Sequence, residues 1–370
     1  MSKEYPSDTA NNGDREPGGR GGRAVKPKRR SRAARSQIVI FLNLCLSLAF
    51  FGVLTIGAIL YWGKGEFEEA GPLRQEATYV VPRSASLGTI AEGLERNGII
   101  SNGGIFNYGV RLAGAAGDLK AGEFLFPPGV SMRGVMEKLR SGESIQHSIT
   151  IPEGWTVQRA YERIAQADVL AGSMPGQVPE GMLRAETYNV QRGMQRSALI
   201  ERMRKEQEAM VQEVWEGRDA DLPVEDIGEF VTLASIVERE TGIASERPHV
   251  ASVFVNRLRK GMRLQSDPTF LYGVYGGAGK PSEAPVTQSD IDSDTPYNTY
   301  RIKGLPPGPI AIPGRAALEA VAHPLDTDDL YFVADGTGGH VFSKTLDEHN
   351  RNVQKYRQIE RERRAQADGQ

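Results

Sequence analysis

Residues 38–62 form an apolar run, IVIFLNLCLSLAFFGVLTIGAILYW, that contains no lysine, arginine, aspartate or glutamate. An α-helix rises about 1.5 Å per residue, so a run of this length can cross a hydrocarbon core of about 30 Å. Tyr61 and Trp62 end the run, where interfacial aromatic residues are expected. The pattern therefore predicts a transmembrane helix over 38–62.

The charges on either side of this run predict its orientation. The basic segment KPKRRSRAAR precedes it, and GKGEFEEAG follows it. The positive-inside rule then places the N-terminus in the cytoplasm and the long remainder of the chain outside it. A cleaved signal peptide is the alternative interpretation, but it would have a shorter apolar region and a small-x-small cleavage site after it. Neither feature is present, so the pattern favours an uncleaved anchor.

After a polar linker, short periodic segments predict a small α+β module over 78–146. ATYVVP has the composition of a strand, and SLGTIAEGLERNGII predicts a helix because Leu87, Ile90 and Leu94 fall on one face. GGIFNYGVRLAG predicts a second helix, AGEFLFPPG a second strand, and SMRGVMEKLRSG a third helix with Ser131 as its N-cap.

The rest of the chain alternates between helices and turn-rich loops. A strand and a helix capped by Thr156 are expected first, and a Gly- and Pro-rich loop over 171–187 follows. Further helices are predicted over 191–217, from residue 230, in RPHVASVFVNRLRKG, near RAALEAVAHP and towards the C-terminus, separated by segments rich in turn residues and aromatics. We therefore expect an α+β fold with a disordered basic tail at 1–36, the membrane helix at 38–62, the small module at 78–146, a connector with a cleft loop at 147–190, a mixed α/β domain at 191–358 and a polar tail at 359–370.

Composition narrows the function classes only slightly. The net charge is −2, with 25% charged and 39% hydrophobic residues, so the chain as a whole offers no argument for nucleic-acid binding. The ten Lys/Arg of residues 1–36, against four Asp/Glu, are explained by membrane topology. The single cysteine, Cys45, excludes an internal disulfide. The five histidines follow no metal-binding spacing, so we expect no metal and no cofactor.

Two glutamates, Glu238 and Glu240, follow an apolar stretch in FVTLASIVERETG, residues 230–242. At about 100° per residue, Glu240 borders the apolar stripe of the predicted helix, and Glu238 lies farther round, towards its edge. Burial disfavours the ionised form of a carboxyl and raises its pKa, which suits a general acid at neutral pH. The alternative is that Glu240 is a structural carboxylate at the edge of the core, paired with Arg257, Arg259 or Arg263.

The spacing of these glutamates limits the chemistry they can share. Carboxylates two positions apart on a helix diverge by about 200°, so Glu238 and Glu240 cannot flank one glycosidic bond. Two-carboxylate glycosidase chemistry would need a distant partner, such as Asp267 or Asp335. Lytic cleavage of a glycan needs only one carboxyl, which protonates the glycosidic oxygen and then deprotonates the sugar's C6 hydroxyl, closing a 1,6-anhydro ring. The segments YNTY, LPPGPI and GGHVFS carry stacking faces and hydrogen-bonding groups of the kind that bind sugars.

The chain resembles the YceG-like family, the endolytic murein transglycosylases. The resemblance is closest over about 230–357, in the segments LASIVERET, ASERPHVASVFVNRLRKGMRLQSDPTFLYG, TPYNTYRIKGLPPGPIAIPG, AVAHP, LYFVADGTGGHVFS and HNRNVQKY. More loosely, GTIAEGLERNGII, LKAGEFLFPPGVSMRGVMEKLRSGE and ITIPEGWTVQRAYERI are similar to that family's LysM-like module. The single membrane helix also fits the family.

The resemblance implies a single-pass inner-membrane enzyme whose catalytic domain faces the periplasm. Such an enzyme cleaves nascent glycan strands between MurNAc and GlcNAc, leaves 1,6-anhydro-MurNAc ends and terminates strand elongation. Glycan strands are the implied substrate, and peptidoglycan synthases or the elongation and division machinery are the implied partners. The family's catalytic glutamate, expected in a groove, aligns with Glu240, and Glu238 is the second candidate. The residues implied in substrate binding or in orienting Glu240 are Gln265, Asp267, Tyr297, Asn298, Tyr300 and His340.

One segment, EGMLRAETYNV over 180–190, departs from the family's pattern. Arg184 and Ala185 stand where an apolar residue and a proline are expected, so the rigidity of the cleft loop is in question. Glu186 still matches and is a further candidate for substrate binding. Two other functions stay open: a non-catalytic glycan-binding scaffold of the wall-synthesis machinery, and a hydrolytic muramidase.

Overall fold

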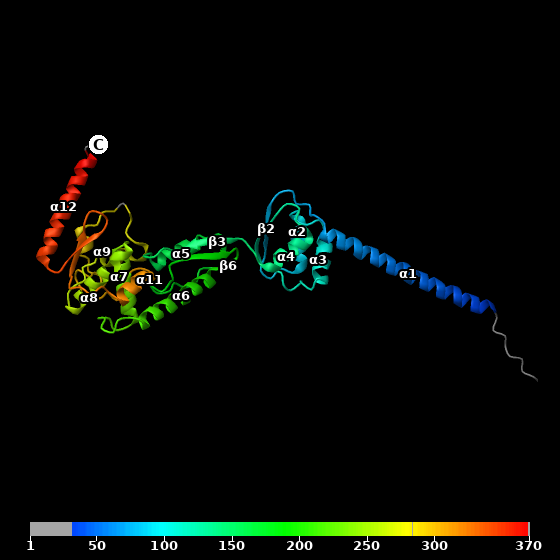
Figure 1. The fold of residues 1–370 in the computed structure, drawn as a ribbon, viewed down its shortest axis with the longest axis horizontal. Helices are drawn as coiled ribbons and strands as arrows, with labels where there is room; N and C mark the ends of the chain where they lie inside the picture. The colour runs from blue at the N-terminus through cyan, green and yellow to red at the C-terminus, as the bar shows by residue number, and fades with distance from the viewer. Residues whose placement is uncertain (1–31, 283, 369–370) are drawn as a thin grey trace, which may run out of the picture. The chain divides into compact units, whose positions relative to one another are not determined.

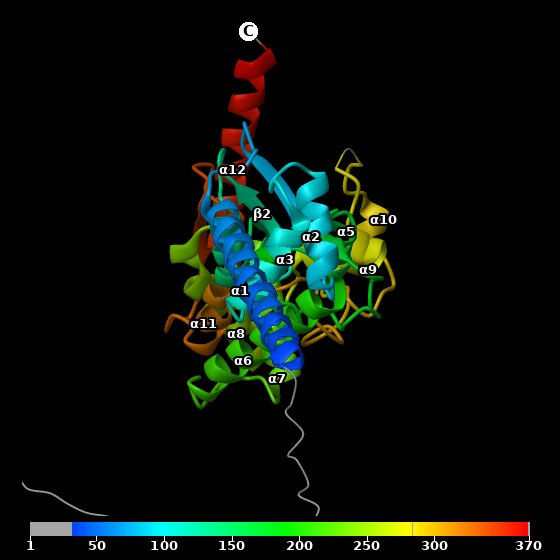
Figure 2. The same ribbon diagram turned by 90° about the vertical axis from the view of Figure 1, so that its right-hand side faces the viewer.

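The computed structural model describes residues 32–282 and 284–368 (Figures 1 and 2). Residues 1–31, the greater part of the segment expected to be a disordered basic tail, lie outside the described residues. The described chain mixes α-helices with short two-stranded sheets, as the α+β expectation requires. It divides into two compact units, Met1–Gly65 and Glu66–Gln370.

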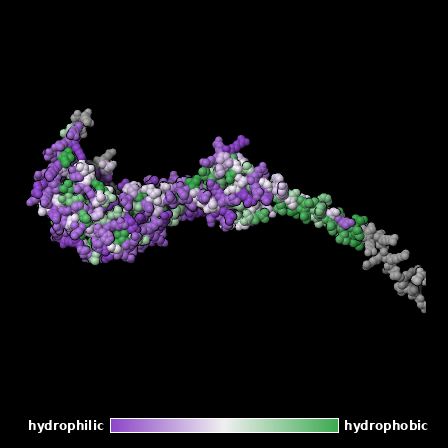
Figure 3. Space-filling model, viewed as in Figure 1, coloured by the Kyte–Doolittle hydropathy of each residue, from purple (hydrophilic) through white to green (hydrophobic). Residues whose placement is uncertain are grey.

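The first unit carries most of α1, a helix that runs from Arg32 to Glu68. It begins before the expected span of 38–62 and continues to residue 68, through the first part of the linker expected over 63–77. Its large apolar side chains over 38–62 are exposed, and Figure 3 shows the resulting apolar surface in green. Within the described residues, Gln37–Glu68 is long and apolar enough to cross a membrane. Lipid rather than water is the favourable surrounding for such a surface, so α1 supports a single-pass membrane anchor.

The small module forms with the predicted order of elements. β1 (Ala77–Val81) pairs antiparallel with β2 (Gly122–Phe126), and the three helices are α2 (Leu87–Arg96), α3 (Gly103–Leu112) and α4 (Met132–Ser141). The predicted cap of α4 is confirmed, because the hydroxyl of Ser131 accepts the backbone N–H of Gly134.

This module has an apolar core of its own. Leu94, Phe106 and Phe124 are fully buried in it. The last turn of α1 joins this core, since Phe67 is only 6% exposed and its ring centroid lies 6.4 Å from that of Phe106. Residues 66–68 are therefore part of the folded module and do not act as a free linker.

The region expected to be a connector over 147–190 is more regular than predicted. β3 (Gln146–Thr150) pairs antiparallel with β5 (Thr187–Gln191), and β4 (Leu170–Ala171) pairs parallel with β6 (Met194–Gln195). In the chain, α5 (Val157–Ala165) lies between β3 and β4 and begins after its predicted cap, Thr156. β5 was not predicted from the sequence, although its residues alternate between exposed and buried positions as in a strand that packs on one face.

Four helices build the core of the larger domain: α6 (Arg196–Glu216), α7 (Ile227–Glu240), α8 (Arg247–Arg259) and α11 (Arg315–Ala322). The helix α7 contacts the other three and lies among them in Figure 1. All residues from Phe230 to Val237 are buried, so α7 is enclosed on every side, whereas the sequence predicted an amphipathic helix. The buried surface of α7 is wider than the apolar stripe that the sequence predicted. Different faces of the helix are covered by α6, α8, α11 and the segment around Ile310. Glu240 is thus the last residue of a rigid central helix.

The turn-rich region after Gly261 contains more helix than predicted. α9 (Asp267–Tyr275) and α10 (Gln288–Ile291) are both absent from the sequence-based expectation. Pro268 lies in the first turn of α9, where its missing N–H has no helical partner to lose. β7 (Tyr331–Ala334) and β8 (His340–Ser343) then form an antiparallel hairpin. α12 (Leu346–Asp368) continues through most of the segment expected to be a polar tail.

Candidate functional site

Glu240 is the last residue of α7 and is half-buried. The hydroxyl of Ser266 donates a hydrogen bond to its Oε1. Ser266 is 1% exposed and precedes α9, the helix that begins at Asp267. The carboxyl of Glu240 is therefore held between the end of one helix and the start of another.

The electrostatic surroundings raise the pKa of Glu240 to about 7, and burial is the main cause. The hydrogen bond from Ser266 opposes this rise, whereas the negative charge of Asp267 adds to it. The positive charges of His340 and Arg257 lower the pKa again. At neutral pH the carboxyl is therefore present in both its protonated and its ionised form, as a group that first donates and then accepts a proton requires.

The alternative role for Glu240, a carboxylate paired with an arginine, finds no support among the described residues. The guanidinium of Arg257 donates to the backbone oxygens of Leu330 and Leu264, at 2.6 and 2.7 Å. Arg259 forms its ion pair with Asp221, and Arg263 donates to the Tyr300 carbonyl oxygen. None of the three arginines forms an ion pair with Glu240 within the part of the chain that the structure describes.

Glu238 has a structural explanation of its own. Its Oε1 lies 3.2 Å from Nη2 of Arg247, and its Oε2 accepts the backbone N–H of Gly314 at 3.0 Å. The side chain is 5% exposed, so it lies deeper than the edge position that the helical projection predicted. Burial raises the pKa of Glu238, while the Gly314 hydrogen bond and the Arg247 charge oppose the rise. Both carboxylate oxygens fasten α7 to neighbouring elements, which favours Glu240 as the reactive carboxyl.

Asp267 and Tyr300 lie next to Glu240 and are bonded to each other. The hydroxyl of Tyr300 donates to Oδ1 of Asp267 at 2.6 Å, and its ring packs edge-on against Phe270 at 5.8 Å. Burial raises the pKa of Tyr300, and the charges of Asp267 and Glu240 add to this effect. Asp267 is exposed, so this pair joins the buried carboxyl to the surface.

Gln265 stands directly before Ser266 in a left-handed backbone conformation, with φ 54°. Such a conformation is uncommon for a residue other than glycine. Its backbone N–H donates to the carbonyl oxygen of Thr299 at 3.2 Å, and its side chain is exposed. The turn therefore brings Ser266 to Glu240 and keeps the Gln265 side chain at the surface, where its Oε1 accepts a hydrogen bond from Nη1 of Arg257 at 3.5 Å.

Asn298, predicted to bind substrate or to help orient Glu240, is completely buried. Its amide nitrogen donates to the carbonyl oxygens of Ile291 and Ser293, each at 2.8 Å, and its Oδ1 accepts the N–H of Tyr300 at 3.0 Å. These bonds stay within the segment 291–300, so Asn298 shapes the loop that presents Tyr300.

Tyr297 belongs to a second cluster, which the sequence analysis did not detect as a unit. Its ring lies 5.0 Å from that of Tyr272, whose hydroxyl donates to Oε2 of Glu180 at 3.3 Å. Oε1 of Glu180 accepts the N–H of Val157 at 2.8 Å, and burial raises the pKa of this carboxyl. Glu180 thus fastens the cleft loop to the start of α5 and to α9. It lies 92 positions from Tyr272, so spacing gave no signal for the pair.

His340 begins β8 and is bound to Glu246, another residue that the sequence analysis missed. Nδ1 of His340 lies 2.8 Å from Oε2 of Glu246, and the His340 backbone N–H donates to Oε1 at 2.9 Å. The hydroxyl of Thr241 donates to Oε2 of Glu246 at 3.3 Å. Glu246 therefore links the residue that follows Glu240 to the start of β8.

The structure brings two other predicted residues to different places. Glu186 is exposed and forms its ion pair with Arg184, at 3.3 Å; it makes no contact with the residues around Glu240 in the described chain. Asp335, the possible distant carboxylate, accepts the backbone N–H groups of Thr337 and Gly339, and these bonds help to lower its pKa. Its role is to close the turn between β7 and β8.

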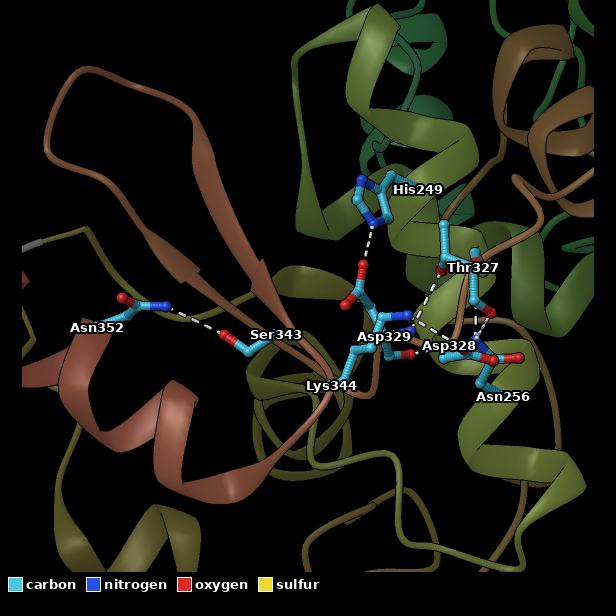
Figure 4. Close-up of polar contacts among 9 residues, drawn as sticks. His249, Asn256, Thr327, Asp328, Asp329, Ser343, Lys344 and Asn352 are labelled. Carbon is cyan, nitrogen blue, oxygen red and sulfur yellow. Dashed lines mark hydrogen bonds and ion pairs between the residues drawn. The ribbon is translucent and has the colours of Figure 1, made fainter.

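A network on the other side of this hairpin holds it against α8 (Figure 4). Nε2 of His249 lies 2.8 Å from Oδ2 of Asp329, and the His249 ring stacks on Phe342 with centroids 3.4 Å apart. Asn256 donates to the carbonyl oxygens of Thr327 and Asp329. A polar cavity of about 340 Å³ lies beside this network, and its lining includes neither Glu240 nor its neighbours.

The described residues, 32–282 and 284–368, contain no group of three or more His, Cys, Asp or Glu side chains placed to hold a metal ion. The chemistry available at the Glu240 cluster is that of one carboxyl of raised pKa with hydroxyl, carboxylate and imidazole neighbours.

Comparison with known proteins places this site in a family. The model of the YceG-like family matches residues 79–355. The endolytic murein transglycosylase of Bacillus subtilis (strain 168) is 32% identical over 339 residues, which cover 82% of this chain and 91% of the relative. The enzyme of the same name from Streptococcus pneumoniae serotype 2 is 27% identical and aligns over 76% of this chain and 58% of its own length.

One solved structure is also similar, a putative YceG-like protein from Listeria monocytogenes. It is 29% identical, with a TM-score of 0.48, and the match covers 75% of this chain and 98% of that one. The family match extends over the small module, the central helices and the Glu240 cluster. The chain therefore belongs to the YceG-like family.

Proposed function

We propose that the protein is an endolytic peptidoglycan lytic transglycosylase with Glu240 as its catalytic acid and base. One observation carries the proposal: Glu240 is a half-buried carboxyl with a pKa of about 7, which accepts a hydrogen bond from Ser266 and forms no ion pair within the described residues. The names of the relatives from Bacillus subtilis and Streptococcus pneumoniae support a peptidoglycan transglycosylase role.

In the proposed reaction, Glu240 in its protonated form gives its proton to the glycosidic oxygen between MurNAc and GlcNAc. The bond from C1 of MurNAc to that oxygen breaks, and the GlcNAc side leaves as an alcohol. The Glu240 carboxylate then takes the proton of the MurNAc C6 hydroxyl while O6 bonds to C1. The products are a 1,6-anhydro-MurNAc end and a regenerated protonated Glu240, and no water is consumed. Cleavage inside a nascent strand ends its elongation.

The neighbouring residues have distinct roles in this proposal. Asp267, Tyr300, Gln265 and His340 surround the carboxyl or the exposed surface next to it, so they are the candidates for saccharide contact at the cleavage point. Tyr297 lies with its aromatic partner on the adjoining cluster and offers a stacking face. Asn298 acts indirectly, through the loop it shapes. Glu186 pairs with Arg184, so we propose that it contacts a part of the glycan strand farther from the cleavage point.

The membrane helix sets the place of action in this proposal. We propose that α1 anchors the protein in the inner membrane with its N-terminus in the cytoplasm and its catalytic domain in the periplasm, where nascent strands are made. The module over 78–146 is proposed to be LysM-like and to bind glycan. Peptidoglycan synthases of the elongation or division machinery are the proposed partners.

Mass spectrometry of the products tests the reaction. The full-length protein in detergent is incubated with uncrosslinked glycan strands, and we expect internal cleavage to give anhydro-ended fragments. Glu240→Gln should abolish these products, because an amide cannot donate the proton. The matched control is Glu225→Gln, an exposed glutamate just before the cap of α7, which should leave the products unchanged.

The same spectra distinguish the alternatives. Reducing ends that are heavier by one water would identify a hydrolytic muramidase. Absence of cleavage in the wild-type protein under all conditions would favour a glycan-binding scaffold. If Glu240→Gln retained full activity and Glu238→Gln lost it, the assignment of the acid would be wrong.

A further inference from the structure

Glu246 is a largely buried carboxylate that takes no direct part in the proposed reaction. Both of its oxygens nevertheless form hydrogen bonds with His340. Its side chain is 18% exposed and that of His340 is 17% exposed. Its two oxygens bind the ring Nδ1 and the backbone N–H of His340, and Oε2 also accepts from Thr241. A Cβ at Gly339 would lie 2.8 Å from Oε1 of Glu246, so the hairpin approaches this carboxylate closely, and a side chain there would have to displace it.

The protonation of Glu246 decides which nitrogen of His340 carries hydrogen. Burial alone would raise the pKa of Glu246, but the hydrogen bonds from the ring and backbone N–H of His340, with that from Thr241, outweigh it and hold the pKa below its usual value. Glu246 is therefore ionised at neutral pH and can only accept hydrogen bonds. The proton between the two groups must then reside on Nδ1 of His340, and Nε2 is the free nitrogen of the neutral ring.

We propose that Glu246 is a positioning residue of the Glu240 site, which fixes the tautomer and orientation of His340 so that Nε2 is the ring nitrogen that can accept a hydrogen bond or a second proton at that site. This inference rests on the proposed function, and it gives the Glu246–His340 pair a part in that reaction. When Glu240 has released its proton, a cation at His340 stabilises the resulting carboxylate. When Glu240 takes up the proton of the C6 hydroxyl, that stabilisation is no longer needed.

The contacts of His340 explain why the ring has one orientation. Phe332 packs edge-on against it with centroids 5.4 Å apart, and Phe342 lies at 6.5 Å. These rings come from the same hairpin, while Glu246 comes from the short helical turn before α8. The two aromatic rings and the carboxylate of Glu246 together fix the orientation of the His340 ring.

Three charged side chains act on the pKa of Glu240. Asp267 faces the carboxyl from α9, Arg257 from α8 and His340 from β8. Arg257 donates to backbone oxygens and to the side-chain oxygen of Gln265, so its guanidinium is held in place. His340 is instead held by the carboxylate of Glu246, so a change at Glu246 reaches Glu240 through His340.

The tautomer is tested on the full-length protein in detergent micelles with ¹⁵N-labelled histidine. The spectrum of His340→Gln identifies the signals of His340 among the five histidines. We expect Nδ1 to be protonated and Nε2 to be the unprotonated nitrogen of the neutral ring. Glu246→Gln should return the ring to a mixture of tautomers or reverse it. A wild-type ring protonated at Nε2 would overturn the inference, whether or not Glu240 proves to be the catalytic acid.

The kinetic test uses the pH dependence of kcat for release of anhydro-ended fragments. Activity requires protonated Glu240, so its alkaline limb should follow the pKa of about 7. Removal of a nearby cation raises the pKa of a carboxyl, by about 1 unit for a close charge. We expect Glu246→Gln and His340→Gln each to move this limb upward by up to about 1 pH unit and to lower kcat roughly 10–100-fold, the effect of losing a ring-orienting partner at metal-bound histidines.

Two comparisons separate positioning from simple structural support. The double variant should match His340→Gln alone, because Glu246 acts through His340. Asp329→Asn is the matched control: it breaks the other His–carboxylate pair that holds the same hairpin, and it should leave the alkaline limb in place. The proposal would be refuted if the losses of kcat in the two single variants added up in the double variant. It would also be refuted if the alkaline limb of the pH profile moved in Asp329→Asn but not in Glu246→Gln. Thermal unfolding of each variant verifies that it is folded at the assay temperature.

Discussion

Glu240→Gln should make the protein more stable above neutral pH, even as it removes the proposed activity. The pKa of Glu240 rises from 4.5 to about 7 in the folded chain. A carboxyl whose pKa is raised by folding binds its proton more tightly in the native state, so stability is lost as pH rises from 4.5 towards 7. At about 1.36 kcal/mol per pKa unit, the ionised side chain costs about 3 kcal/mol once the pH is well above 7. Glutamine is neutral at every pH and still offers an oxygen to Ser266, so it escapes this cost.

The assay is urea unfolding of the full-length wild-type and Glu240→Gln proteins in detergent at pH 5 and pH 8. We expect the variant to be more stable by about 3 kcal/mol at pH 8 and by less than about 1 kcal/mol at pH 5. The exposed Glu225→Gln variant should show no such difference. Equal stability of wild type and Glu240→Gln at both pH values would refute the reasoning, because it would mean that burial does not raise the pKa of this carboxyl.

Three other substitutions test separate parts of the structure. Ser266→Ala removes the hydrogen bond that lowers the pKa of Glu240, so the alkaline limb of the pH–rate profile should move upward; an unchanged limb would show that the hydroxyl does not act on the carboxyl. Gly109→Ala places a Cβ against the ring of Phe67, and it should destabilise the module by about 1–3 kcal/mol, measured by hydrogen exchange of the module's amides. Leu233→Ala empties a fully buried position of α7 and should lower the unfolding free energy by about 2–5 kcal/mol, measured by denaturant titration; a loss below about 1 kcal/mol would contradict the enclosed position of the helix.

Local signals predicted much of the fold. The helix caps Ser131 and Thr156 hold the turns that their positions indicated, because a hydroxyl before an apolar-periodic segment satisfies an otherwise unbonded N–H. The signal failed where two cues conflicted. In SDPTFLYG the proline and glycine indicated a turn, but Ser266, Asp267 and Pro268 are also a helix start, and α9 begins there.

The sequence predicted the carboxyl at the centre of the site but not its partners, because the contacts between them join distant segments. The position of Glu240 at the border of the apolar stripe identified a carboxyl of raised pKa, and the structure agrees. Its partner Ser266 is 26 positions away, and Glu246 is 94 positions from His340. Periodicity describes one element at a time, so it cannot report which loop lies across from it. It also underestimated the burial of Glu238, since three helices cover α7 where the projection allowed for one face.

The place of Glu240 at the C-terminal end of α7 has a consequence for the charge that develops in the proposed reaction. A helix carries about half a negative elementary charge at its C-terminus, and cleavage of a glycosidic bond passes through an oxocarbenium-like state with positive charge near C1. In the proposed reaction Glu240 protonates the glycosidic oxygen that is bonded to C1. C1 must therefore lie close to the C-terminal end of α7. Because residues 230–237 of this helix are buried, its dipole is fixed in place before the substrate arrives. A cationic iminosugar should therefore bind this site more tightly than an uncharged sugar of the same shape.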